Sequence, residues 1–140
     1  MSKYISLLII ILLLPPFVVY THFALTSGRH HYTKNNIFSF WLYTPESLKE
    51  IPFISSNSTY VYDFNIDNQQ TRVTIIWSNI DDITDKQKVL KNFIESFNGL
   101  NKYDCSWIYN DKNNYMNNYQ RYCIFQKEKS LELEYFDTET

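Results

Sequence analysis

Hydrophobic and polar residues are arranged in three distinct patterns along the chain. Residues 4–25 contain no charged side chain, and their first half is an almost unbroken aliphatic run. Apolar and polar residues alternate over residues 60–66, 73–77 and 131–135, which is the period of half-buried strands. Residues 89–97 place apolar side chains three and four apart, the period of an amphipathic helix. This order predicts an α+β fold: an apolar N-terminal helix, then a small antiparallel sheet with one packed α-helix.

The apolar N-terminal segment is predicted to bring the chain to a membrane. A spanning helix needs about 20 apolar residues, a length that residues 4–25 just meet. In a retained transmembrane anchor, Pro15 and Pro16 would kink the helix, as bilayers tolerate. In a cleaved signal peptide, they would end it. The scarcity of small residues at the expected cleavage position favours the anchor. We assign residues 1–27 to the anchor or signal and residues 28–140 to a single domain.

The two cysteines indicate the compartment. Cys105 and Cys123 lie in alternating stretches on either side of an Asn-rich turn, and a hairpin folded about Asn114 sets them opposite each other. Facing Cβ atoms in an antiparallel pair are about 4.5–5.5 Å apart, close to what a disulfide requires. We therefore predict a Cys105–Cys123 disulfide, which forms in an oxidising compartment such as the bacterial periplasm. Two buried free thiols are the alternative.

The charges beside the apolar segment do not decide its orientation, because Lys3 precedes it and Arg29 and Lys34 follow it. The predicted disulfide places the C-terminal domain outside the cytoplasm. We expect a single-pass inner-membrane protein with this domain in the periplasm, or a periplasmic protein if the segment is cleaved.

The cysteine hairpin also carries a candidate interaction surface. Its register sets Trp107 against Arg121, which permits a cation–π contact. Tyr, Trp and Arg anchor many protein interfaces. Alternation sends neighbouring side chains to opposite faces, so some of these aromatic residues must pack in the core. The predicted surface comprises Trp107, Tyr109, Tyr115, Tyr119 and Arg121.

The remaining local predictions concern secondary structure. Residues 37–43 form a compact apolar run and are predicted to be a buried strand, followed by a short turn or single helical turn between two prolines. Residues 26–36 are expected to be a polar stretch beside the membrane. Thr84, followed by Gln87 three residues later, fits a capping box at the start of the helix. Gly99 is placed at its end.

The composition argues against nucleic acid as a partner. The chain has 13 Lys and Arg against 15 Asp and Glu, and nucleic-acid binding usually needs a clear basic excess. A polybasic patch for anionic lipid is also missing from the sequence. The three histidines, His22, His30 and His31, are expected to be solvated near the membrane rather than to bind metal.

The acidic residues do not predict a metal or catalytic site either. Asp81, Asp82 and Asp85 lack the spacing of a calcium loop, and they suit a helix N-terminus. Glu132 and Glu134 are expected on the outer face of a strand, in contact with solvent. We expect no cofactor and no metal, and we predict that the protein is not an enzyme.

These observations predict a membrane-anchored, extracytoplasmic, non-enzymatic protein-interaction domain. A component of an envelope complex, or an immunity or inhibitor protein, would have this organisation. The alternative is a small-ligand or glycan-binding module that stacks sugars on its aromatic residues. A third hypothesis is a small hydrolase that uses carboxylates.

The disulfide is tested by thiol accessibility from outside the membrane. We expect Cys105 and Cys123 to resist an impermeant maleimide until a reductant is added, and reduction to lower the free energy of unfolding by about 3 kcal/mol. Labelling of both thiols in unfolded protein without reduction would show that the bond is absent.

Overall fold

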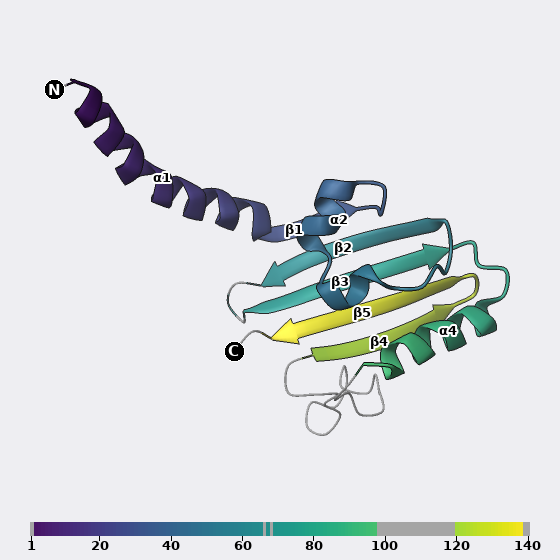
Figure 1. Cartoon of the computed structure of the whole chain (residues 1–140). Helices are drawn as coiled ribbons and strands as arrows, with labels where there is room; N and C mark the ends of the chain where they lie inside the picture. The colour runs from purple at the N-terminus through teal and green to yellow at the C-terminus, as the bar shows by residue number, and fades with distance from the viewer. Residues whose placement is uncertain (1, 66, 68, 98–119, 139–140) are drawn as a thin grey trace.

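The computed structural model describes residues 2–65, 67, 69–97 and 120–138, and for residues 2–10, 23, 26 and 138 it describes the backbone alone. The predicted antiparallel α+β architecture is confirmed: five strands form one sheet in the order β1-β2-β3-β5-β4, with every pair antiparallel (Figure 1). The strands are β1 (Gly28–Tyr32), β2 (Asn57–Asn65), β3 (Gln70–Ser78), β4 (Gln120–Lys127) and β5 (Ser130–Thr138).

The alternating stretches form strands that lie side by side in the sheet. In the β2–β3 hairpin, Tyr60 pairs with Ile75 and Tyr62 with Val73. The β5 strand then pairs with β3 so that Leu133 lies beside Ile75. These side chains project to the same face of the sheet because residues in register share a face. The predicted strands over residues 73–77 and 131–135 are therefore confirmed, as are residues 60–65 of the strand predicted over residues 60–66; residue 66 lies outside the described residues.

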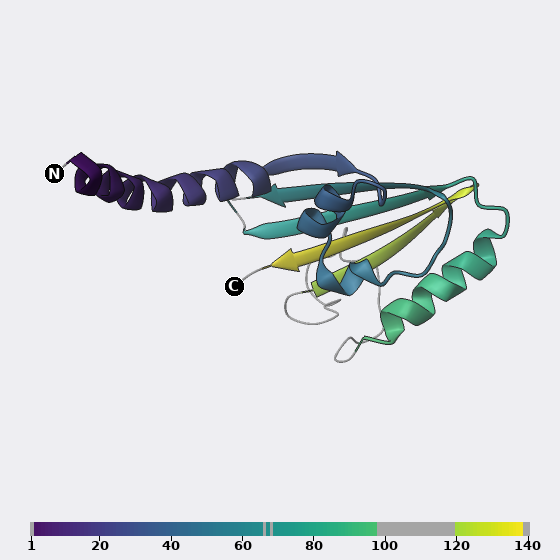
Figure 2. The same ribbon diagram turned by 45° about the horizontal axis from the view of Figure 1, so that its top comes forward.

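In the described part of the chain, helices cover one face of the sheet. They are α1 (Ser2–Thr26), α2 (Ile37–Tyr43), α3 (Glu46–Lys49) and α4 (Ile83–Glu95). Figure 2 shows α2, α3 and α4 on the same side of the sheet, while α1 projects beyond its edge. The core fills the space between these helices and the sheet, and its largest fully buried members are Tyr60, Tyr122, Tyr135, Leu48, Ile75, Leu90, Ile94, Leu131 and Leu133.

The prediction of a buried strand at residues 37–43 is wrong, because these residues form helix α2. The Asn36 side chain accepts a hydrogen bond from the Ser39 backbone N–H over 3.2 Å and so caps the helix start. Pro45 forces the residue before it into an extended conformation, which ends the helix. A short apolar run has no periodicity that separates a strand from a helix. The single helical turn expected next is confirmed as α3.

The polar stretch over residues 26–36 contains a strand that the sequence pattern did not predict. Gly28 has a φ of +88°, a conformation that glycine adopts readily, and it turns the chain from α1 into β1. Tyr32 then lies beside Tyr60 of β2 and is buried in the core. The inward side chains of β1 include a histidine, so the strand lacks the apolar alternation by which strands are recognised.

Helix α4 was predicted with the correct apolar stripe but the wrong cap. Leu90 and Ile94 are buried, and the flanking apolar residues of the stripe pack against the core. The cap is Asp82, whose Oδ1 accepts a hydrogen bond from the Asp85 backbone N–H over 3.1 Å. Thr84 lies within the first turn instead. Gly99 lies outside the described residues.

Helix α1 continues through Pro15 and Pro16 without a break in its assignment. Within the part of the chain that the structure describes, no helix combines the length and the apolar character that a bilayer crossing requires.

The position of the α4 cap is tested by removing each candidate acceptor. We expect Asp82→Ala to lower the free energy of unfolding by about 1 kcal/mol, because it leaves a backbone N–H of the first turn without its acceptor. Asp82→Asn, which keeps an acceptor oxygen, and Thr84→Ala are the matched controls and should cost little. Urea unfolding of the full chain in detergent provides the measurement, and a larger loss from Thr84→Ala than from Asp82→Ala would contradict the assigned cap.

Candidate functional site

Of the residues predicted to form the disulfide and the interaction surface, the structure describes two, and both lie on β4. Cys123 is fully buried, and Arg121 is half-buried. Both project away from the helices, because they alternate with Tyr122 and Ile124, which belong to the core. Cys105, Trp107, Tyr109, Tyr115 and Tyr119 lie outside the described residues, so the disulfide and the aromatic surface stay predictions.

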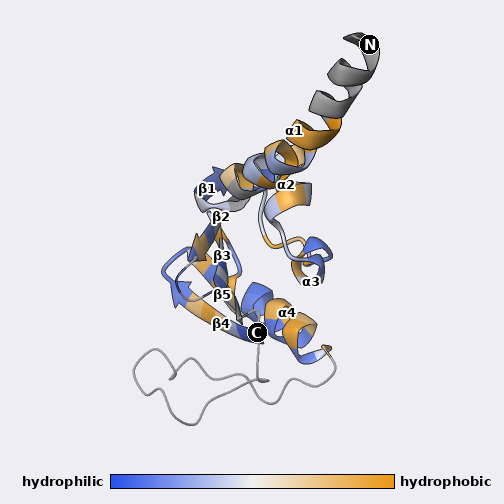
Figure 3. Cartoon of the chain, turned by 90° about the vertical axis from the view of Figure 1, so that its left-hand side faces the viewer, coloured by the Kyte–Doolittle hydropathy of each residue, from blue (hydrophilic) through white to orange (hydrophobic). Residues whose placement is uncertain are grey.

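Arg121 belongs to a larger surface, the outer sheet face, which is the side of the sheet opposite the helices. Figure 3 shows this sheet on edge, with the helices on one side. Among the described residues, no helix packs on the outer sheet face. The strand register sets its side chains in rows across β2, β3, β5 and β4: Asp63, Arg72, Phe136 and Arg121 in one row, and Val61, Thr74, Glu134 and Cys123 in the next.

The first of these rows is ordered by charge and ring contacts. The Arg72 guanidinium donates a hydrogen bond to Asp63 Oδ2 over 2.8 Å. The same guanidinium lies 5.9 Å from the centre of the Phe136 ring, within the range of a cation–π contact. Side chains that hold each other in this way lose less conformational freedom when a partner binds, so the row forms a preorganised surface.

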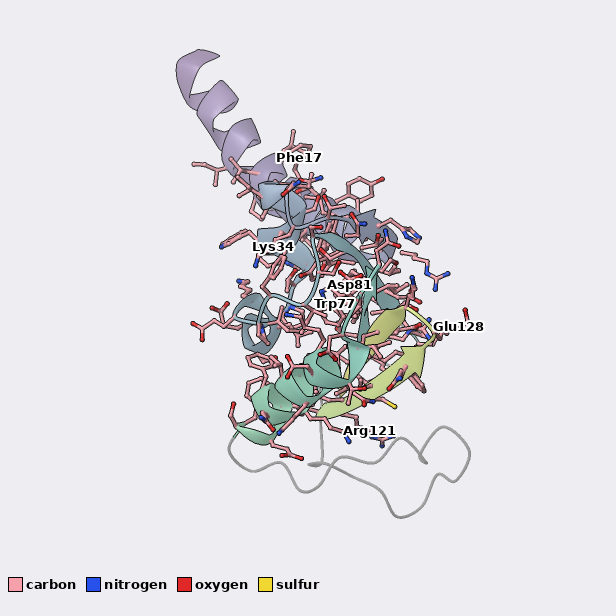
Figure 4. The ribbon with its side chains drawn as sticks, turned by 90° about the vertical axis from the view of Figure 1, so that its right-hand side faces the viewer. Phe17, Lys34, Trp77, Asp81, Arg121 and Glu128 are labelled. Atoms are coloured by element: carbon pink, nitrogen blue, oxygen red, sulfur yellow. The ribbon has the colours of Figure 1, made fainter. Side chains whose placement is uncertain are left out.

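A hollow of about 630 Å³ lies at the β4–β5 end of the outer sheet face. One ion pair lies in its lining: Lys127 Nζ is 3.2 Å from Glu132 Oε2. Figure 4 marks Glu128 at the turn that closes this end of the hairpin. The residues that line the hollow are Arg72, Ile124, Phe125, Gln126, Lys127, Glu132, Glu134 and Phe136.

The carboxyl group of Glu134 is perturbed by its surroundings on this surface. Glu132 and Glu134 face away from the helices, as predicted, but Glu134 is half-buried rather than freely solvated. Its burial raises the pKa of Glu134, the nearby charge of Glu132 raises it further, and Arg72 partly offsets both effects. A charged group that is poorly hydrated before binding loses little hydration when a partner covers it, so Glu134 suits contact with a cationic or hydrogen-bond-donating group.

A second, smaller hollow of about 360 Å³ lies on the helical side of the sheet. The Tyr135 hydroxyl donates to Asp137 Oδ2 over 2.7 Å and accepts from Gln120 Nε2 over 3.2 Å. Nearby, the Tyr122 hydroxyl donates to Ser47 Oγ over 3.1 Å. Burial raises the pKa of Tyr135 and of Tyr122, so both hydroxyls stay protonated at neutral pH. These groups satisfy one another and fasten β4, β5 and α3 together.

The histidine and acidic clusters carry structural contacts. The ring of His30 stacks on Tyr43 with centroids 4.3 Å apart, and its Nε2 donates to the Ser27 carbonyl over 3.0 Å, so His30 is not simply solvated. Asp82 caps α4, in keeping with the expected place of the three aspartates at a helix start. In the described ranges, no group of three or more His, Cys, Asp or Glu side chains is arranged to hold a metal ion.

Sequence reasoning missed Arg72, Phe136 and the role of Glu134. The alternation that places them on one face is visible in the sequence, with Arg72 two residues before Thr74 and Glu134 two residues before Phe136. Their proximity depends on the pairing of β3 with β5, which are separated by more than fifty residues. No signal in the sequence fixes that pairing.

Comparison with known proteins gives no match to this chain among protein-family models, characterised sequences or solved structures.

The raised pKa of Glu134 is tested by the pH dependence of stability. The folded protein binds the Glu134 proton more tightly than the unfolded chain, so this group destabilises the fold progressively as the pH rises above the ordinary carboxyl range. Glu134→Gln removes this loss. The free energy of unfolding of Glu134→Gln minus that of the natural protein should therefore be larger at pH 7 than at pH 4. Urea unfolding of both proteins at the two pH values measures this difference.

Glu128→Gln is the matched control, because Glu128 lies in the exposed β4–β5 turn. The same stability difference between Glu134→Gln and the natural protein at both pH values would show that the carboxyl is not perturbed.

Proposed function

We propose that the chain is a membrane-anchored, extracytoplasmic domain that binds a protein partner through its outer sheet face and catalyses no reaction. The observation that carries this proposal is the surface itself: a sheet face that no described helix covers, with an ordered Asp63–Arg72–Phe136 row beside a hollow. Interfaces favour arginine and aromatic residues with complementary charges around them. Such a domain suits a component of an envelope complex, or an immunity or inhibitor protein.

The anchor is supported by the sequence of residues 4–25. The uncharged run begins at Tyr4, among residues whose side chains lie outside the described part, and it extends to Leu25. Its length agrees with the thickness of a bilayer core. In this proposal the segment stays in the inner membrane and the domain lies in the periplasm, where the predicted disulfide forms; cleavage would release the same domain into the periplasm.

The partner is expected to present both signs of charge. Arg72 and Arg121 stand on either side of Phe136 in the same row, and Glu134 lies one row away. A partner that places a carboxylate beside the arginines and a basic group near Glu134 would satisfy both. Electrostatic matching of this kind selects the partner and sets its register more than it sets the affinity.

The hollow also supports a second candidate, a small-ligand or glycan-binding module. Phe125 and Phe136 line it together with Arg72, Glu132 and Glu134. Aromatic rings beside paired charges are common in sites that bind polar small molecules. A small molecule that fits this hollow would be held without any protein partner.

The two candidates are separated by crosslinking in the cell envelope. A photoreactive amino acid at position 125, on the outer sheet face, should capture a distinct protein. The same residue at position 88, on the exposed side of α4, is the control and should capture none. A domain that binds only small molecules would give no protein adduct at position 125.

A charge swap tests whether the partner binds to the Asp63–Arg72 pair. Asp63→Arg combined with Arg72→Asp keeps opposite charges side by side, so the melting temperature should change little. Because the partner meets the reversed pair, the adduct at position 125 should be lost. An undiminished adduct from a correctly folded double variant would contradict binding through this row.

A further inference from the structure

Helix α2 exposes an apolar surface on the side that faces away from the core. Ile37, Phe38 and Trp41 are 80%, 65% and 67% exposed. They lie three and four residues apart and so share one side of the helix. The opposite side packs inward through Phe40 and Tyr43. Contiguous exposed apolar side chains of this kind mark a contact with a protein, a ligand or a membrane. We call these three residues the α2 patch.

Hydrogen bonding holds the α2 patch close to the end of α1. The Tyr43 hydroxyl, at the last residue of α2, donates to the Leu25 carbonyl over 2.8 Å. Leu25 lies in the last turn of α1, one residue before the helix ends. Figure 3 shows α2 beside this end of α1. The C-terminal end of α2 therefore lies beside the end of the uncharged segment.

The residues around the α2 patch are those of a membrane interface. Lys49 Nζ lies 5.7 Å from the centre of the Trp41 ring and 2.7 Å from Glu46 Oε2, and Lys34 Nζ lies 5.8 Å from the centre of the Phe40 ring. Trp is enriched at the level of the lipid headgroups, and lysines beside it reach the phosphates. A protein partner would not require this combination to lie next to a membrane anchor.

We propose that the α2 patch lies in the interface of the lipid bilayer, with Ile37, Phe38 and Trp41 among the headgroups and upper acyl chains. The inference rests on the proposed anchor, since α1 brings the patch to the bilayer. The hydrogen bond from Tyr43 holds α2 to α1, and the patch contacts the lipid, so the two together fix the domain against the membrane. Because α2 covers the helical side of the sheet, this docking leaves the outer sheet face out of contact with lipid and accessible to a partner.

The test uses the full chain in vesicles of phosphatidylcholine and phosphatidylglycerol. A genetically encoded, environment-sensitive fluorophore replaces Phe38 in the α2 patch, Phe17 in α1, or Lys88 on α4. Lipids with a nitroxide high on the acyl chain quench only nearby fluorophores. We expect strong quenching at positions 17 and 38 and several-fold weaker quenching at position 88. Thermal unfolding of each labelled protein verifies that it is folded.

The position of quenching separates the two proposals. Quenching at position 17 without quenching at position 38 would overturn docking of the α2 patch and leave the anchor intact. An unquenched position 17 would overturn the anchor, whatever happens at position 38. The fluorophore at position 38 could instead show blue-shifted emission without quenching, with a shift that grows as the protein-to-lipid ratio rises. That result would mean that a second copy of the chain covers the patch, and it would also overturn the inference.

Discussion

The contacts of Tyr43 join the two parts of the molecule. Its hydroxyl satisfies the Leu25 carbonyl, one of the four carbonyl groups that a helix end leaves without a partner. Its ring stacks on His30 of β1 and contacts the rings of Tyr32 and Tyr62. One side chain of α2 therefore holds the end of α1 against the edge of the sheet. The direction of the domain relative to α1, and so to the proposed membrane, depends on this junction.

The sheet divides the proposed tasks between its two faces. The helical face carries the core, a closed set of buried rings and aliphatic side chains with satisfied hydroxyls. The outer sheet face carries ion pairs, two phenylalanines and a carboxyl group whose pKa is raised by burial. Buried charge adds little to stability in general. The half-buried charges of the outer face therefore support the proposed recognition of a partner.

The parts of the fold that the sequence predicted are those with a clear period. Apolar and polar side chains alternate over residues 60–65 and 73–77, and the apolar stripe around Leu90 repeats every three to four residues. The strands β2 and β3 and the helix α4 were therefore correctly placed. The α2 helix was not, because a run of seven residues that is apolar except for Ser39 fits either structure, and tertiary contacts decided. Within the candidate site, the alternation of side chains along β4 was enough to predict that Arg121 lies on the surface. Arg72 and Phe136 could not be predicted in this way, since a long-range strand pairing brings them together.

The junction at Tyr43 is tested most directly by the distance between α1 and the sheet in solution. Spin labels at Tyr20 of α1 and Lys88 of α4, both exposed, report that distance by pulsed electron resonance in full-chain protein. A fixed junction predicts one narrow distance distribution that broadens in Tyr43→Ala and stays narrow in Asp82→Asn. An equally broad distribution in the natural protein and in Tyr43→Ala would contradict it, because α1 would then move independently of the domain.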